Sequence, residues 1–250
     1  MKRMGAFFPY TTENIQPGFS VDCVVFSFYK KKLRVLLNKF DFSDYWQLPG
    51  GFMFKTESSD DAAKRILATR TGLTNVYLKQ FYLFSDPART KIDQNTAYLA
   101  GGEGSDELAG WFLQRFVSLG YIAFLRYDEV ELTVTKEDMP KWFAINDLPE
   151  LYSDHANIIK TALETMRPLL PVLPVGRELL PEKFTMSELR KIYEVILGKA
   201  LDRRNFQRKI LSMGILTPLD EVGNNSSYNP PVLYKFTGEQ KDMINNLNFL

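Results

Sequence analysis

The sequence has 250 residues, of which 45% are hydrophobic and 24% charged, and a net charge of +1; this suffices for one large or two ordinary domains and excludes a chain that is polybasic along its whole length. One histidine and one cysteine exclude a Cys/His zinc site and an internal disulfide, and we expect no metal and no cofactor. No apolar stretch is as long as a membrane span, and the N-terminal apolar run is too short for a signal peptide, so we expect a cytoplasmic protein.

The first two thirds of the chain combine strand patterns with one clear helix. Apolar runs predict five strands, over residues 21–28, 33–40, 76–84, 115–126 and 142–145. Lysines 30–32 form a solvated turn between the first two strands. Apolar spacing predicts a helix over 57–71, which Gly72 ends. Residues 85–110 are polar and Gly-rich and are interpreted as a loop, whereas 146–166 are interpreted as helical.

A Pro-rich, uncharged stretch at residues 169–176 breaks the preceding helix. It divides the chain into an N-terminal domain of residues 1–170 and a C-terminal domain of residues 171–250. Beyond the boundary, the patterns predict two helices, over residues 186–197 and 202–213. They then predict a hairpin, with strands over 215–217 and 232–236 and a polar tip over 223–229.

A motif of fixed spacing begins at the Pro-Gly-Gly turn. The matching residues are Gly51, Glu57, Arg65, Leu67, Gly72 and Leu73, preceded by Trp46, Leu48, Pro49 and Gly50. This spacing resembles the Nudix box over its full length, from residue 51 to residue 73. The resemblance implies that residues 1–170 form an α/β (α+β) Nudix sandwich.

The departures from the box concern its chemistry. The family's three catalytic glutamates fall on Ile66, Thr69 and Arg70. Positions i, i+3 and i+4 share one side of a helix, where carboxylates would jointly hold Mg²⁺ and activate water. A guanidinium at one of them would repel the cation, so we expect no catalytic residues and no ordinary Nudix hydrolysis. Asp60 and Asp61 are interpreted as complementing the helix dipole, with relocated metal binding as the alternative.

Without its metal, the motif predicts a pocket for a small effector. Its candidate binding residues are Gly50, Gly51, Glu57 and Arg70. Arg70 would pair with an anion or with sugar hydroxyls, or else form a structural salt bridge. Glu57 and Arg65 also fit a structural role in the turn that enters the helix. His155 is interpreted as a hydrogen-bonded structural histidine, with a polar contact between domains as the alternative.

The second C-terminal helix is basic on one side. From residue 183 to 209, eight Lys or Arg stand against three acidic residues. Phe206, Ile210 and Met213 share an apolar face, and Arg204 and Arg208 lie nearly opposite. Arginine contacts phosphates and guanine, and Asn or Gln reads adenine. The candidate DNA-binding residues are Lys183, Arg203, Arg204, Asn205, Gln207, Arg208 and Lys235. The alternative is a solvated basic helix of a dimerisation domain.

Several segments together resemble the NrtR-like Nudix-related transcription regulators: residues 60–65, 154–155, 179–185, 202–206 and 233–236. The resemblance covers essentially the whole chain. It implies a smaller winged helix-turn-helix domain after the Nudix sandwich, and a homodimer that binds a palindromic operator in double-stranded DNA. The missing glutamates and residues 60–77 favour the branch that resembles an arabinose-responsive regulator of carbohydrate metabolism, with an ADP-ribose-like nucleotide as the other effector.

Three functions follow. The first is a DNA-binding transcription regulator whose catalytically inactive Nudix-like domain senses a small effector, such as arabinose, and alters operator binding. The second is a Nudix hydrolase of a nucleoside diphosphate derivative, with carboxylates supplied by Glu103, Asp106, Glu107, Asp128 or Glu129. The third is a binding module without activity whose tail only dimerises.

Overall fold

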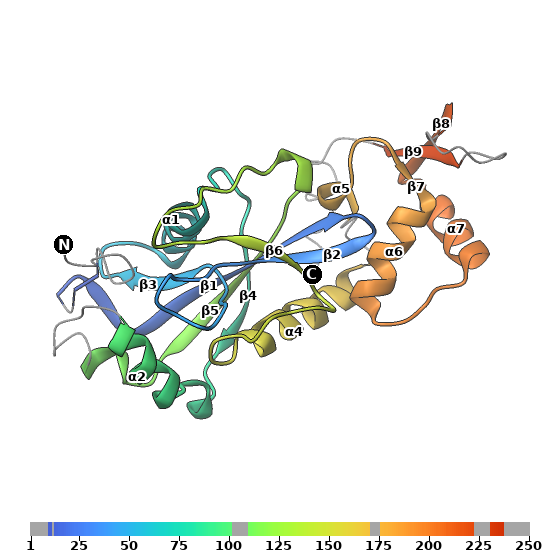
Figure 1. Cartoon of the computed structure of the whole chain (residues 1–250). Helices are drawn as coiled ribbons and strands as arrows, with labels where there is room; N and C mark the ends of the chain where they lie inside the picture. Colours follow the sequence, from blue (N-terminus) through green and yellow to red (C-terminus); the bar gives the residue numbers. More distant parts are fainter. Residues whose placement is uncertain (1–9, 12, 102–109, 171–175, 223–230, 238–250) are drawn as a thin grey trace. The chain divides into compact units, whose positions relative to one another are not determined.

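The computed structural model describes residues 10–11, 13–101, 110–170, 176–222 and 231–237. The chain forms two compact units (Figure 1). The first comprises residues 1–26, 34–123 and 129–162, and the second joins residues 163–250 with the short stretches 27–33 and 124–128. In the described ranges, no helix combines the length and the apolar character needed to span a bilayer.

A six-stranded sheet contains all five expected strands and one more. Its members are β1 (Ile15–Tyr29), β2 (Lys32–Leu37), β3 (Gly50–Phe54), β4 (Lys79–Phe84), β5 (Val117–Phe124) and β6 (Lys141–Ala144). The order is β4-β5-β1-β2-β6, and β3 pairs with β1 in antiparallel register. The sequence pattern missed the first part of β1 because residues 16–20 are not buried and the pairing with β3 shifts register there.

The core of the first unit lies around β1, whose residues 21–26 are all buried. A buried run of mostly apolar residues is typical of a central strand covered on both faces. In Figure 1, α1 (Ser59–Thr71) and the first turns of α4 (His155–Met166) lie on opposite sides of the sheet. The buried residues of α4 include Ile158, Ile159 and Ala162, which form its packed face.

Helix α1 confirms the expected helix and its stop. The Ser58 hydroxyl caps the N-terminus by accepting a hydrogen bond from the Asp61 N–H. Gly72 has φ of 79°, and its N–H donates to the Ala68 carbonyl. A Cβ at Gly72 would collide with the Thr133 side chain, so both conformation and space require glycine there.

The interpretation of residues 85–110 as a loop was wrong. This segment contains the 3₁₀ helix η1 (Pro87–Arg89) and the helix α2 (Ile92–Gly101), while residues 102–109 lie outside the described ranges. The Asp86 carboxylate caps η1 by accepting from the Ala88 N–H at 2.8 Å. Inside α2, the buried Asn95 amide donates to the Phe112 carbonyl at 2.9 Å. Tertiary hydrogen bonds of this kind leave no periodic apolar pattern in the sequence.

The expected helical stretch from residue 146 also begins too early, because α4 starts at His155. Pro149 disfavours helical conformation at the residue before it. Ser153 has φ of 51°, which helices do not contain. These features keep residues 146–154 irregular until the Asp154 carbonyl accepts the first helical hydrogen bond, from the Ile158 N–H.

The turn between β1 and β2 holds two lysines in a left-handed conformation. Lys30 and Lys31 have φ of 49° and 61°. Two-residue hairpin turns with positive φ at both positions favour Asn-Gly, because other residues are strained there. We expect the variant Lys30→Asn/Lys31→Gly to raise the free energy of unfolding by about 1 kcal/mol. Urea denaturation of the variant and the parent protein measures this, and an unchanged midpoint would contradict the expectation.

The second unit confirms the two expected helices and the hairpin. Its elements are α5 (Gly176–Leu179), β7 (Phe184–Thr185), α6 (Met186–Leu197), α7 (Arg203–Ser212), β8 (Leu216–Val222) and β9 (Val232–Phe236), besides η3 (Arg167–Leu169). The strands form a sheet in the order β7-β9-β8. Thr185 and Glu188 form a capping box at α6, which Gly198 ends with φ of 69°. The expected hairpin tip at residues 223–229 lies outside the described residues.

Candidate functional site

A cavity of about 100 Å³ lies in the first unit. Its apolar side is formed by the rings of Phe40, Phe52, Phe112 and Phe116. Its polar side includes Asp22, Arg70, Arg89, Asn95, Tyr152, Ser153 and His155. A cavity with aromatic faces on one side and a few polar groups on the other suits a small ligand that has both apolar C–H faces and hydrogen-bonding groups.

Two glycines shape one wall of this cavity. A Cβ at Gly50 would collide with the Asp22 carboxylate. At Gly51, a Cβ would lie 2.5 Å from the Tyr10 hydroxyl and 3.2 Å from Ile66 Cγ1. Both residues line the cavity, so the structure places these two candidate effector-binding residues at the site.

A buried network of charges forms the polar side. Arg89 donates two hydrogen bonds to Asp154, from Nε at 3.0 Å and from Nη2 at 2.9 Å. The same Nη2 lies 3.8 Å from Asp22 Oδ2, which also accepts from the Ser118 hydroxyl. Arg89 and Asp22 are both buried, and pairing of this kind compensates charges that would otherwise be costly away from water.

His155 belongs to the same network. Its Nδ1 accepts a hydrogen bond from the Leu48 N–H at 2.8 Å, and its Nε2 lies 3.7 Å from Asp22 Oδ1. An Nδ1 that accepts a hydrogen bond carries no proton, so the neutral ring is protonated on Nε2. Burial lowers the pKa of His155, and the nearby carboxylates of Asp22 and Asp154 offset only part of that effect.

This neutral histidine predicts a loss of stability in mild acid. The unfolded chain takes up a proton below a pKa of about 6.5, which the folded protein does not, so stability falls as pH drops below that value. The slope reaches up to about 1.4 kcal/mol per pH unit. Urea denaturation at pH 7.5, 6.5 and 5.5 measures it. The variant His155→Gln should show a shallower decline, and an equal decline in both proteins would contradict the assignment.

Arg70 lines the cavity but is also held by a carboxylate. Its Nη1 lies 3.2 Å from Asp138 Oδ2, and both side chains are buried. The guanidinium packs 4.7 Å from the centre of the Phe40 ring. Burial raises the pKa of Asp138, although Arg70 and a hydrogen bond from Asn38 act in the opposite direction. The geometry therefore contains the structural salt bridge that was the alternative interpretation of Arg70.

Glu57 does not line the cavity. Its carboxylate accepts from Arg65 Nε at 2.9 Å and from the Phe54 N–H at 2.7 Å. Arg65 in turn donates to the Phe52 carbonyl at 2.8 Å. Burial raises the pKa of Glu57, but the hydrogen bonds from Arg65 and Phe54 outweigh it and bring the pKa below its usual value. These contacts fix the loop that enters α1.

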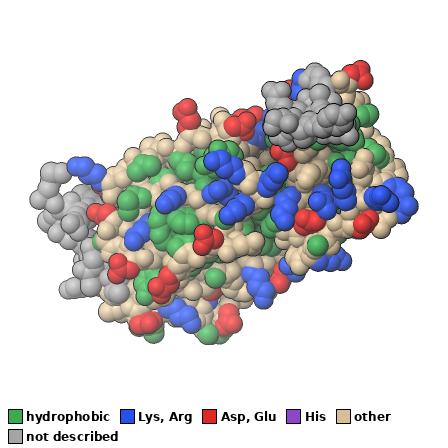
Figure 2. Space-filling model, turned by 45° about the vertical axis from the view of Figure 1, so that its right-hand side comes forward, with side chains coloured by type: hydrophobic (Ala, Val, Ile, Leu, Met, Phe, Trp, Pro, Cys, Tyr) green, Lys and Arg blue, Asp and Glu red, His purple; other side chains and the backbone are tan. Residues whose placement is uncertain are grey.

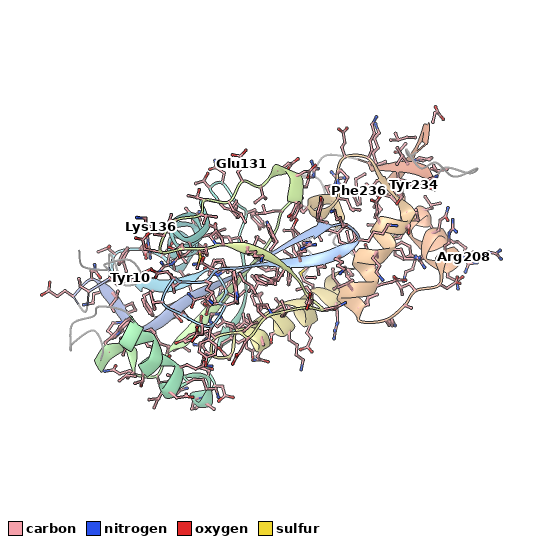
Figure 3. The ribbon with its side chains drawn as sticks, viewed as in Figure 1. Tyr10, Glu131, Lys136, Arg208, Tyr234 and Phe236 are labelled. Carbon is pink, nitrogen blue, oxygen red and sulfur yellow. The ribbon has the colours of Figure 1, made fainter. Side chains whose placement is uncertain are left out.

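Helix α7 carries the candidate DNA-binding residues of the second unit. The Asp202 carboxylate caps it by accepting from the Asn205 N–H at 2.8 Å. Phe206 and Ile210 are buried, whereas Met213 is 37% exposed and does not complete the apolar face as expected. Among the exposed candidate residues, Arg203, Arg204, Asn205 and Arg208 lie on α7, and Lys235 lies on β9. Figure 3 shows Arg208 extending outward from α7.

Some of the other polar side chains on and near α7 are engaged in hydrogen bonds or ion pairs. Gln207 is half-buried, and its amide donates to the Tyr234 hydroxyl at 3.4 Å. Lys183, exposed before β7, lies outside α7. Arg190 and Lys191 on α6 each lie 3.5 Å from the Glu194 carboxylate. The Leu201 N–H donates to the same carboxylate, which lowers the pKa of Glu194 and fixes the turn before α7. On α7 itself, the exposed cations are Arg203, Arg204, Arg208 and Lys209.

Comparison with protein families matches residues 17–162 to the NUDIX domain. The chain belongs to the NUDIX domain family. Residues 176–236 match the NrtR DNA-binding winged helix domain. The expected fold, an α/β Nudix sandwich followed by a smaller winged helix-turn-helix domain, is confirmed.

This Nudix protein is similar to several others over most of its length. It is 24% identical over 233 residues to the "ADPR responsive transcriptional repressor NtrR" of Acinetobacter baylyi, covering 90% of this chain and 84% of the relative. The crystal structure of Shewanella oneidensis NrtR complexed with a 27mer DNA has a TM-score of 0.62 at 26% identity, covering 88% of this chain and 93% of that one. A MutT/nudix family protein from Enterococcus faecalis shares the fold, with a TM-score of 0.62 at 23% identity, and the match covers 91% and 89% of the two chains. The expected NrtR-like architecture is confirmed.

Of the three Nudix-box positions that carry catalytic glutamates in the family, Arg70 lines the cavity, whereas Ile66 and Thr69 do not. Ile66 is buried against Gly51, Thr69 is exposed, and Arg70 pairs with Asp138. Asp60 accepts a hydrogen bond from the Tyr121 hydroxyl, and Asp61 from the Ser58 hydroxyl. Within the described ranges, no group of three His, Cys, Asp or Glu side chains is arranged to hold a metal ion.

The carboxylates of the alternative hydrolase are not assembled by the described residues. Asp128 and Glu129 are exposed in the 3₁₀ helix η2 (Tyr127–Glu129) and do not line the cavity. The other three candidates, Glu103, Asp106 and Glu107, lie outside the described residues.

The polar residues of the Nudix cavity that were missed in the sequence include Asp22, Arg89, Asn95, Tyr152 and Ser153. Asp22 carried a signal, because a carboxylate inside an apolar strand needs a buried partner. Arg89 and Asn95 lie in the segment interpreted as a loop, so their burial was not apparent. Tyr152 precedes α4, and its hydroxyl donates to Asn95 Oδ1.

Proposed function

We propose that this protein is a transcription regulator that binds duplex operator DNA through α7. The observation that carries the proposal is the exposed basic face of α7 on a domain that matches the NrtR DNA-binding winged helix. In helix-turn-helix proteins, the second helix enters the major groove and its exposed side chains contact base edges. The similar NrtR of Shewanella oneidensis was crystallised with DNA, which supports the same use of the domain here.

We further propose that the protein acts as a homodimer of two-domain chains, with an effector-binding domain of residues 1–170 and a DNA-binding domain of residues 171–250. The boundary lies between the two stretches that match family models. A two-fold symmetric protein binds a palindromic operator with one winged helix on each half-site.

The proposed effector is a small sugar such as arabinose, which links the protein to carbohydrate metabolism. A cavity of about 100 Å³ is small compared with the roughly 300 Å³ at the lower end of drug-sized pockets. Its phenylalanine rings suit the C–H face of a sugar, and its carboxylate, amide and hydroxyl groups suit sugar hydroxyls. Both lining arginines are paired with carboxylates, so the cavity offers little net positive charge to a diphosphate.

ADP-ribose is the second candidate effector. It is supported by the name of the Acinetobacter baylyi relative, which describes that protein as ADPR-responsive. Isothermal titration calorimetry with L-arabinose, D-arabinose and ADP-ribose separates the candidates. Binding of L-arabinose but not of its enantiomer supports the sugar, and binding of ADP-ribose alone transfers the proposal to the nucleotide. Heat from none of the three would contradict both effectors.

We propose that the Nudix domain is a sensor and not a hydrolase. Hydrolysis of a diphosphate requires a metal held by carboxylates, and the box positions carry Ile66, Thr69 and Arg70. Incubation with ADP-ribose and Mg²⁺, followed by chromatography of the products, tests this proposal. Metal-dependent release of AMP would favour the alternative hydrolase.

The DNA-binding proposal has its own test. Fluorescence anisotropy with duplexes from the upstream region of the protein's own gene, and with random duplex of equal length, gives affinities at several salt concentrations. We expect tight binding to one upstream duplex that weakens as salt rises, because phosphate contacts release counterions. Equal affinity for all duplexes would contradict a sequence-reading regulator.

A further inference from the structure

The turn between β1 and β2 presents three consecutive lysines. Lys30, Lys31 and Lys32 are all exposed. They lie in the stretch 27–33, which belongs to the same compact unit as the winged helix. Among the described contacts, Lys31 and Lys32 have no carboxylate partner. Three ammonium groups at successive positions form a concentrated positive charge, which is separate from the basic face of α7.

The backbone of this turn is strained, as its two left-handed lysines show. Asn-Gly would relieve the strain, and side chains retained in a strained conformation point to a use for them. Aromatic contacts also hold the turn in place. Tyr29 stacks on Tyr127 with ring centroids 4.1 Å apart and planes 10° apart, and Lys30 Nζ lies 5.3 Å from the centre of the Tyr29 ring.

The neighbouring charged residues do not cancel the positive charge of the three lysines. Arg126 and Asp128 flank Tyr127 in the neighbouring stretch of the same unit and balance each other in sign. Together with the exposed arginines of α7, the lysines give the second unit an excess of positive charge. Figure 2 shows more Lys and Arg than Asp and Glu side chains on the face of this unit that is turned forward. A polyanion is the partner whose charge complements such a surface.

We propose that Lys30, Lys31 and Lys32 bind phosphates of duplex DNA as a second contact beside the bases read by α7. This inference rests on the proposed DNA binding. Duplex DNA is favoured over other polyanions because the same compact unit carries the winged helix. Phosphate contacts position a protein on the duplex without reading its sequence, so the lysines add affinity and salt dependence but no selectivity.

The test is the variant Lys31→Gln/Lys32→Gln in the full-length protein. Anisotropy titrations on the upstream duplex and on random duplex, over a range of salt concentrations, are compared with the parent protein. We expect affinity for both duplexes to fall by a similar factor, roughly tenfold, and the slope of log affinity against log salt to fall by about 2 per bound chain. The matched control Lys91→Gln/Lys136→Gln removes two exposed lysines of the first unit and should leave the slope unchanged.

A second variant excludes misfolding as the cause. Lys30→Asn/Lys31→Gly is expected to fold more stably than the parent protein and yet to bind both duplexes more weakly. An unchanged salt slope in both turn variants would overturn the lysine contact while leaving DNA binding through α7 intact. An equal loss in the control variant would also overturn it, because the effect would then not belong to the turn. Absence of salt-dependent duplex binding by the parent protein would overturn both proposals.

Discussion

The variant Arg204→Ala/Arg208→Ala should lose at least about 30-fold in affinity for the operator. Each arginine that contacts a base edge contributes roughly 1–3 kcal/mol of discrimination, so two together give a loss of this size. Both side chains are exposed on α7, and Arg208 Nη2 is oriented by a hydrogen bond to Asn205 Oδ1 at 2.9 Å. Anisotropy titration with operator and random duplex measures the change.

The loss should be larger on the operator than on random duplex, which distinguishes base contacts from general charge. The control Lys91→Ala/Lys136→Ala removes the same charge from the first unit, where Figure 3 labels Lys136, and should change operator affinity little. Circular dichroism verifies that α7 remains folded, since its buried anchors Phe206 and Ile210 are untouched. A loss of less than threefold would mean that α7 is not the helix that reads the operator.

The variant Arg89→Ala should destabilise the Nudix domain by about 3–5 kcal/mol. Removing one partner of a buried ion pair leaves an uncompensated charge away from water. Here Asp154 loses two hydrogen bonds, and Asp22 loses its neighbouring guanidinium. Urea denaturation followed by tryptophan fluorescence measures the free energy of unfolding.

The double variant Arg89→Ala/Asp154→Ala is the control for this mechanism. Removing the Asp154 carboxylate as well removes one of the unpaired charges, so the double variant should be more stable than Arg89→Ala alone. A destabilisation below about 1 kcal/mol in the single variant would show that solvent compensates these carboxylates. That result would contradict the burial of Asp22 and the low exposure of the Asp154 side chain, 15%.

The elements that the sequence predicted well are those marked by local chemistry. Helix α1 has Ser58 and Gly72 at its ends, and both residue types favour those positions for reasons of hydrogen bonding and backbone conformation. The same holds for α7, which Asp202 caps and whose buried face includes Phe206 and Ile210. The spacing of the Nudix box and the helix-helix-hairpin order of the winged helix could likewise be predicted from the sequence, because each is a local pattern.

The cavity was harder to predict, since its polar side joins residues distant in sequence. Asp22 lies near Arg89 and His155, and the three residues come from three separate parts of the chain. Arg70 finds Asp138 only through the fold. Pairings of this kind depend on tertiary packing, so residue type and spacing predicted Gly50, Gly51 and Arg70 at the cavity and missed the network behind them.

The most direct test of an effector-controlled DNA-binding protein is a single anisotropy titration. The purified protein is titrated into labelled upstream duplex without ligand, with L-arabinose and with ADP-ribose, and into random duplex under the same conditions. An effector alters operator affinity only if it binds the two states of the protein unequally. We predict sequence-selective binding that one ligand changes at least fivefold. Binding that does not distinguish the upstream duplex from random DNA under any ligand would contradict the proposal.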